Sequence, residues 1–410
     1  MSIPNAATAP AAGGLDAELA ALRETIAGRL PDFLDDLATL VGIDCGSYTK
    51  AGVDEVGRFV ASRFAALGAT VEVRPHDTLG ATVVGSFAGM AGRPRLLLIG
   101  HMDTVFGEGT AAERPFRIAD GIATGPGVSD MKGGLLAGLY TLEALRSTLD
   151  ELPFERLTYI TNPDEEIGSP SSTPIIRGHA AEADACFVLE GARANGDIVS
   201  SRKGIAELRL TIEGRAAHAG VEPEKGRSAI LAAAGLVTAI DALNGRWPGV
   251  TANVGVIAGG TRPNVVAERA SLEVDLRGVT RAVLEAAVTA VRELTERPVV
   301  PDVTVTIETM AHWPPMEKLE RSGRLVETAI ALAGRLGFPL RDAATGGASD
   351  ANTTAGMAMA TLDGLGPIGG NDHSPDEYLE VDSIVPRTTL LAGLLLAVSR
   401  DPSVRAWRAG

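Results

Sequence analysis

The sequence predicts an α/β protein with a mostly parallel central sheet, into which a second, smaller domain is inserted. In the first 200 residues, continuous apolar runs alternate with amphipathic helical patterns, which is typical of a parallel sheet covered by helices on both faces. Residues 204–313 follow a different order, β-α-β-β-α-β, which is the ferredoxin-like unit. After Pro314 and Pro315 the first alternation resumes, so the middle segment is predicted to be an insertion.

The larger domain is predicted from the following elements in chain order. Helices are expected at residues 15–30 and 33–40, which Pro31 separates, and at 53–67, which Gly68 ends. Strands are expected at 69–73, 81–84, 96–99, 157–161 and 185–189, and further helices at 133–149, 321–336 and 390–398. The inserted unit is predicted from strands at 205–212, 252–257, 270–276 and 303–307 and helices at 228–243 and 282–294.

These elements suggest four segments. Residues 1–14 are rich in Ala, Pro and Gly and lack the basic and apolar regions of a signal peptide, so we expect a disordered leader. Residues 15–203 are then the first part of the larger domain, residues 204–313 the inserted domain, and residues 314–410 the second part of the larger domain.

The composition limits the classes of function. The chain has 410 residues, 45% hydrophobic and 22% charged, as in an ordinary soluble globular protein. A net charge of −15 argues against a nucleic-acid or anionic-membrane partner. No stretch approaches 18 uninterrupted apolar residues, so we expect no transmembrane helix and a cytoplasmic location. Cys45 and Cys186 form neither a zinc-type CxxC pair nor a disulfide framework.

Metal-binding side chains follow the predicted strands of the larger domain. His101 and Asp103 follow one strand, Glu165 and Glu166 a second, and Glu190 a third. Because sites in open α/β sheets collect at the carboxyl ends of the strands, these side chains are expected to converge. Taken alone, the acidic run at residues 164–166 is more typical of a solvated turn than of a metal site, and only the other candidate ligands favour the metal site.

Two more candidate ligands lie outside these strands. Asp130 follows a glycine-rich turn, and His373 lies in the segment NDHSPD near the end of the chain. Imidazoles with carboxylates and no thiolate favour Zn²⁺, Mn²⁺ or Co²⁺. Two histidines and three carboxylates, one of them bridging, would serve two metals.

The motifs HMDTVF, GPGVSDMKGG, TNPDEEIGS, VLEG and NDHSPDEYLE occur together and in this order. In this respect the sequence resembles the M20 family of metallopeptidases, in particular its glutamate-carboxypeptidase-like branch. The resemblance extends from about Leu30 to the end of the chain and includes the inserted segment. It implies a zinc-peptidase-like catalytic domain and an inserted dimerisation domain.

The resemblance also implies the ligand set. His101 and Glu190 hold one metal, Glu166 and His373 hold the other, and Asp130 bridges them. The expected cofactor is two Zn²⁺, with Mn²⁺ or Co²⁺ as alternatives, and a site with a single metal remains open.

Two neighbouring carboxylates have implied roles in the reaction. Asp103 would orient the His101 imidazole through its second ring nitrogen. Glu165 would be the general base that takes a proton from the metal-bridging water and passes it to the leaving amine. The products are an amine and a carboxylic acid.

The inserted domain contributes through His218 in the segment RAAHAG. In the family, this histidine reaches the neighbouring subunit's site and stabilises the oxyanion. Without the resemblance, it would be equally reasonable to interpret His218 as a histidine in a surface turn with no role in the reaction. A domain of this type also has an exposed edge strand that pairs with its twin, so we expect a homodimer.

Four further residues match family positions around the substrate. Asn264 and Arg277 would bind its terminal carboxylate, a task that suits the bidentate guanidinium, although a peripheral ion pair is an alternative for Arg277. Gly347 and Ala348 would line the pocket, where glycine lets the backbone approach the substrate. Relatives often have another small residue in place of Ala348.

The expected function is hydrolysis of an amide or peptide bond in a small peptide or N-acyl amino acid with a free carboxylate. A carboxypeptidase is favoured, with C-terminal glutamate as a candidate leaving group. The alternatives with the same site are an N-acyl-amino-acid deacylase, a dipeptidase or a desuccinylase. A non-catalytic binding scaffold is disfavoured because all five ligand positions and the base are filled.

Overall fold

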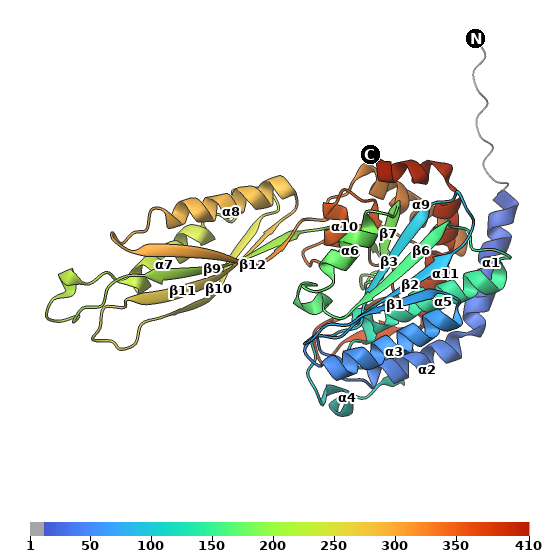
Figure 1. Cartoon of the computed structure of the whole chain (residues 1–410), viewed down its shortest axis with the longest axis horizontal. Helices are drawn as coiled ribbons and strands as arrows, with labels where there is room; N and C mark the ends of the chain where they lie inside the picture. Colours follow the sequence, from blue (N-terminus) through green and yellow to red (C-terminus); the bar gives the residue numbers. More distant parts are fainter. Residues whose placement is uncertain (1–11, 410) are drawn as a thin grey trace, which may run out of the picture. The chain divides into compact units, whose positions relative to one another are not determined.

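The computed structural model describes residues 12–409, which fold into two compact units (Figure 1). Unit 2 comprises Ser201–Glu317 and Ala344–Gly356, and unit 1 comprises the rest of the described residues. Of the predicted leader, residues 1–11 lie outside the described part of the chain, and the first helix begins at Ala12.

Unit 1 is built on a six-stranded sheet with the order β1-β2-β6-β3-β7-β14. The strands are β1 (Thr70–Arg74), β2 (Thr82–Ala88), β6 (Arg156–Asn162), β3 (Arg95–His101), β7 (Ala185–Val188) and β14 (Thr361–Leu362). The last four run parallel to one another, and β2 is antiparallel to both of its neighbours. This confirms the predicted mostly parallel sheet.

The helices of unit 1 are α1 (Ala12–Gly28), α2 (Leu30–Val41), α3 (Lys50–Ala66), α4 (Thr110–Glu113), α5 (Gly133–Thr148), α6 (Thr173–Ala180), α9 (Glu320–Leu336) and α11 (Val381–Arg400), with a final 3₁₀ segment at Pro402–Ala409. Of these, α3, α5, α9 and α11 pack directly against strands of the sheet. Helices α1 and α2 are separated at Arg29, and Pro31 lies in the first turn of α2, where its missing N–H costs no helical hydrogen bond.

Helix α11 is the one described helix that is long and apolar enough to cross a membrane. However, 72% of its apolar window is buried inside the protein, where it packs against α1, α5 and α9. Burial on this scale is typical of the core helix of a globular unit, and it accounts for the apolar sequence without a membrane.

A small four-stranded sheet joins two distant parts of unit 1. Its order is β15 (Gly369–Gly370), β16 (Tyr378–Glu380), β5 (Ile122–Thr124) and β4 (Arg117–Ala119), and all its neighbours are antiparallel. Tyr378 is registered opposite Thr124. The loop between β15 and β16 is therefore placed beside the loop that follows β5.

Unit 2 has the predicted β-α-β-β-α-β order. Its elements are β9 (Gly204–Glu213), α7 (Ala229–Asp241), β10 (Thr251–Gly259), β11 (Arg269–Gly278), α8 (Arg281–Thr295) and β12 (Thr304–Trp313). The sheet order is β10-β11-β9-β12, and both helices pack on it and on each other. The alternating burial along β9 and β11 shows that one face of the sheet is in the core and the other is not.

Unit 2 also includes residues 344–356, which the sequence analysis assigned to the second part of the larger domain. This stretch contains helix α10 (Asp350–Gly356), and two of the four unit boundaries fall inside β8 (Ile198–Arg202) and β13 (Asp342–Thr345). The Asn352 side-chain amide donates to the backbone carbonyls of Lys203 and Pro314, at 3.0 and 2.8 Å. These hydrogen bonds fasten the stretch to the two ends of the inserted segment.

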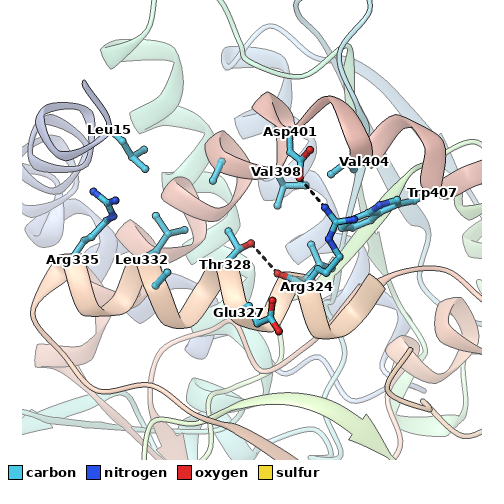
Figure 2. A pocket seen from close by; sticks show the side chains of 13 residues that line it. Leu15, Arg324, Glu327, Thr328, Leu332, Arg335, Val398, Asp401, Val404 and Trp407 are labelled. Atoms are coloured by element: carbon cyan, nitrogen blue, oxygen red, sulfur yellow. Dashed lines mark hydrogen bonds and ion pairs between the residues drawn. The ribbon is translucent and has the colours of Figure 1, made fainter. Parts of the chain in front are cut away.

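A cavity of about 410 Å³ lies on unit 1 among α1, α9, α11 and the C-terminal 3₁₀ segment (Figure 2). The Arg324 guanidinium lies over the Trp407 ring at 5.2 Å and donates to Asp401 at 3.4 Å. None of the residues predicted to act in a site lines this cavity. Cys45 and Cys186 are buried elsewhere and are not joined in a disulfide.

Candidate active site

The carboxyl ends of three parallel strands place the first candidate ligands. His101 is the last residue of β3, opposite Asn162 at the end of β6, and Val188 ends β7 on the other side. The residues that follow β6 and β7 therefore emerge at the same edge as His101. Glu165 and Glu166 form a short 3₁₀ turn (Glu165–Ile167) just after β6.

The other two ligands come from the loops that the small sheet joins. Asp130 lies in a short helical turn, Val128–Lys132, where its own φ of −113° and ψ of 94° depart from helical values. His373 lies between β15 and β16. The small sheet thus brings residues 243 positions apart in the sequence to the same place.

Asp130 lies between two imidazoles. Its Oδ1 is 3.0 Å from Nε2 of His101, and its Oδ2 is 3.1 Å from Nε2 of His373. His373 Nε2 is also 3.1 Å from Oε2 of Glu166, and His101 Nε2 is 3.9 Å from Oε1 of Glu190. The structure therefore brings all five predicted ligands together, with one histidine and one glutamate on each side of Asp130.

The electrostatics of this cluster favour positive charge. Hydrogen bonds to the Asp130 and Glu166 carboxylates raise the pKa of His373 to about 10. Burial alone would lower the pKa of His101, but its bonds to Asp103 and Asp130 outweigh burial and raise it. Burial alone would raise the pKa of Asp130, yet the two imidazoles lower it. A negative potential that stabilises imidazolium also attracts a divalent cation.

The donor set fits divalent metal ions. Candidate ligand atoms of His101, Asp130 and Glu166 lie within 4.8 Å of one another, as do those of His101, Glu165 and Glu190. Glu166 Oε1 is buried and has no hydrogen-bond partner among the described residues. A buried, unsatisfied carboxylate oxygen is costly, and coordination to a cation would satisfy it.

Asp103 supports the cluster in more ways than the sequence indicated. The His101 Nδ1 lies 2.9 Å from the backbone carbonyl of Asp103 and 3.4 Å from its carboxylate, so the expected contact with the second ring nitrogen is present. The same carboxylate accepts the backbone N–H groups of Glu165 and Glu166, at 3.1 and 3.2 Å. One side chain thereby ties the end of β3 to the turn after β6.

Ser47 completes this arrangement and was not found from the sequence. Its hydroxyl donates to Oδ2 of Asp103 at 2.6 Å, and both side chains are buried. Ser47 precedes α3 in a segment without a recognised motif, 56 residues from its partner. Nothing in the local sequence could have indicated it.

In unit 2, Arg277 lies beside the glycine-rich loop. Its Nη1 donates to the Gly346 carbonyl at 2.9 Å, and its Nε donates to the Asp275 carboxylate at 3.0 Å. The bond to Asp275 is the main reason that the pKa of Arg277 is raised. Gly347 contributes its carbonyl to Arg202 at 3.2 Å. The ion pair that the sequence allowed as an alternative role for Arg277 is thus present. Its partner, Asp275, was not identified from the sequence.

Two other candidates of unit 2, His218 and Asn264, are neighbours. His218 is exposed, and its segment bridges to Val265. The backbone N–H of Ala219 donates to the Asn264 carbonyl at 3.0 Å, and the Nδ1 of His218 accepts from the Gly220 N–H at 3.2 Å. The structure therefore places His218 and Asn264 on adjoining segments of the same unit.

Comparison with known proteins gives a consistent result. The family described as peptidase family M20/M25/M40 matches residues 97–397. The chain is 30% identical to carboxypeptidase G2 from Pseudomonas sp. (strain RS-16) over 374 residues, 89% of each protein. It is 26% identical to acetylornithine deacetylase from Edwardsiella ictaluri, over 90% of this chain and 98% of the relative. The crystal structure of aminopeptidase PepT from Bacillus cereus superimposes with a TM-score of 0.74 at 24% identity, covering 90% of this chain and 99% of the other.

The fold, the carboxylate–imidazole cluster and these similarities define a metal-dependent hydrolase. The chain belongs to peptidase family M20/M25/M40.

Proposed function

We propose that the protein is a metallo-exopeptidase of the carboxypeptidase type, which hydrolyses the amide bond of a small peptidyl or N-acyl amino acid with a free carboxylate. The observation that carries this proposal is Asp130, whose two oxygens each face a different imidazole at 3.0 and 3.1 Å. Such a carboxylate is suited to bridge two cations, for which we propose Zn²⁺, with Mn²⁺ or Co²⁺ as alternatives.

The ligands divide into two sets in this proposal. His101 and Glu190 would hold one metal, Glu166 and His373 would hold the other, and Asp130 would be shared. When bound, the two metals would polarise the scissile carbonyl and lower the pKa of the attacking water.

The chain itself supplies the proton transfer. Glu165 neighbours a ligand in the sequence, is only 8% exposed, and has a carboxylate oxygen within 4.8 Å of ligand atoms of His101 and Glu190. We assign it as the general base that takes the water's proton and delivers it to the leaving amine. Asp103 fixes the backbone of Glu165 and so aims this carboxylate.

Arg277 supports a substrate with a free carboxylate. Its guanidinium lies next to the glycine-rich loop, where Gly347 and Ala348 would allow a ligand to approach the backbone. Asn264 would help Arg277 to bind the terminal carboxylate of the same substrate. Similarity to carboxypeptidase G2 favours release of a C-terminal amino acid, with glutamate as the first candidate.

Deacylation of an N-acyl amino acid is the second candidate. It needs the same bond cleavage and the same ligands, and similarity to acetylornithine deacetylase along nearly the whole chain favours it. A dipeptidase or a desuccinylase would use the site in the same way.

We further propose a homodimer that forms through β10. This strand ends the sheet of unit 2 and pairs with β11, and its residues Val256 and Ile257 are 47% and 55% exposed. An exposed apolar edge strand can pair with the same strand of a second copy of the chain. In such a dimer, His218 would act on the oxyanion in the neighbouring subunit's site. Light scattering on the active protein tests this, and a fully active monomer would remove both assignments.

The test of the reaction is amine release from a panel of peptidyl and N-acyl amino acids. Metal-depleted protein should be inactive and should regain turnover with Zn²⁺, Mn²⁺ or Co²⁺. The preferred leaving amino acid and acyl group separate the carboxypeptidase from the deacylase. No turnover across the panel by protein with two metals bound would contradict the proposal.

The role of Glu165 is tested in the same assay. Glu165→Ala should keep both metals and lower kcat by about 10²- to 10⁴-fold, the usual contribution of a general base. The matched control is Glu151→Ala, which removes an exposed carboxylate outside the cluster and should leave kcat unchanged. A near-normal kcat for Glu165→Ala would show that another group is the base.

A further inference from the structure

Glu377 is a buried residue of the motif NDHSPDEYLE, and neither the sequence analysis nor the proposed reaction gives it a role. It is 1% exposed and follows His373 by four residues. Its Oε2 accepts the backbone N–H of Gly127 at 2.9 Å, and its Oε1 accepts those of Ser129 and Asp130 at 2.9 and 3.0 Å. Three amides of the loop that carries Asp130 therefore converge on one side chain.

The conformation of this loop needs such a partner. Gly127 has φ +73°, in the left-handed region that favours glycine, and Asp130 departs from helical φ and ψ. The backbone hydrogen bonds of a regular helix or strand are not enough to fix the conformation of such a loop. A single buried side chain that accepts three N–H groups is a strong restraint on this loop, because each of these amides would lose its acceptor without it.

The position of Glu377 also links the two halves of the cluster. It lies between His373 and Tyr378, and Tyr378 pairs with Thr124 just before the Asp130 loop begins. The same short segment thus carries a candidate ligand, His373, and the carboxylate that holds the backbone of Asp130. A displacement of either loop would alter the distance between Asp130 and His373, now 3.1 Å.

We propose that Glu377 is a positioning residue for the metal centre: it fixes the Asp130 loop to the His373 loop, so that the two oxygens of Asp130 face the two histidines. It contacts Asp130 through the backbone. The inference rests on the metal centre of the proposed function. Groups that orient metal ligands typically change metal affinity by about 10- to 100-fold when they are removed.

Three variants test this role. Glu377→Ala removes all three acceptor contacts. Glu377→Gln keeps the shape, but its amide offers one oxygen, so an NH₂ group must face either Gly127 or the other two amides. The matched control is Asp184→Asn: Asp184 is also buried and accepts the Arg95 N–H at 2.7 Å, but Arg95 begins β3 whereas His101 ends it.

Two measurements on these variants need no substrate. The first is the Zn²⁺ affinity of metal-depleted protein in competition with a chromophoric chelator. The second is hydrogen exchange, by mass spectrometry, of the peptide spanning residues 125–133 in the metal-free protein. We expect Glu377→Ala to bind Zn²⁺ about 10- to 100-fold more weakly and to exchange faster in this peptide, Glu377→Gln to be intermediate, and Asp184→Asn to match the unaltered protein.

The Co²⁺-substituted protein separates positioning from a general loss of stability. If Glu377 sets the ligand geometry, Glu377→Gln should shift the visible absorption bands of bound Co²⁺, while Asp184→Asn should not. Should Glu377→Ala fail to fold, Glu377→Gln decides the question.

Unchanged Zn²⁺ affinity, Co²⁺ bands and exchange in Glu377→Gln and Glu377→Ala would overturn the inference. If the unaltered protein bound no metal, the metal centre itself would be refuted, and the exchange data alone would decide whether Glu377 holds the loop.

Discussion

Replacing Asp103 should destabilise unit 1 in an amount that follows from its contacts. Its carboxylate accepts the Ser47 hydroxyl at 2.6 Å and the N–H groups of Glu165 and Glu166 at 3.1 and 3.2 Å, all in a buried site. A buried donor without an acceptor costs about 1–3 kcal/mol. Asp103→Ala leaves three such donors and should cost about 3 kcal/mol or more.

Asp103→Asn should cost less. Its amide oxygen can still accept the Glu165 N–H, and the Ser47 hydroxyl can turn to accept from the new NH₂ group. The Glu166 N–H alone then faces a donor, so the expected cost is about 1–3 kcal/mol. Ser47→Ala, which removes one bond to a charged group, should also cost about 1.5–3 kcal/mol.

The assay is urea unfolding in the presence of a chelator, so that bound metal adds nothing to the free energy of unfolding. The double variant Ser47→Ala/Asp103→Ala should be little less stable than Asp103→Ala, since the shared bond is lost once. If Asp103→Ala were as stable as the unaltered protein, or if the two single costs simply added, Asp103 would not hold the strand ends together.

Three further predictions concern separate parts of the molecule. Asp130→Ala should lose both metals, because the bridge is shared, and elemental analysis showing one metal retained would argue against bridging. Arg277→Ala should mainly raise KM for carboxylate-bearing substrates, and an unchanged KM would place the carboxylate elsewhere. The hydrogen bond from Arg400 lowers the pKa of Glu18 below its ordinary 4.5, so this pair stabilises the fold above that pH and loses its effect as pH falls through the lowered value. Glu18→Gln should remove about 0.2–1 kcal/mol at pH 7 and progressively less as the pH falls below 4.5, measured by urea unfolding at a series of pH values.

The parallel sheet and the cluster of ligands could be predicted because the signals are local. His101 and Glu190 each follow a continuous apolar run, and such runs become buried parallel strands whose carboxyl ends share one edge. The βαββαβ order of unit 2 was readable for the same reason, since the period of apolar residues changes clearly between its strands and helices.

The supporting residues could not be predicted because their partners are distant in sequence. Ser47 lies 56 residues from Asp103, and Glu377 lies 247 residues from Asp130. A serine in a loop or a glutamate in an acidic segment usually faces solvent, so the residue type alone indicates nothing. Asn352 was missed likewise, and its bonds to Lys203 and Pro314 place residues 344–356 with unit 2.

The central claim is that Asp130 is shared by two metal ions. It is tested most directly by anomalous diffraction at the zinc absorption edge, on crystals of the protein loaded with Zn²⁺. Two peaks are expected, one beside His101 and Glu190 and the other beside Glu166 and His373, with Asp130 in contact with both. A single peak that Asp130 does not contact, or no peak at this cluster in zinc-loaded active protein, would contradict it.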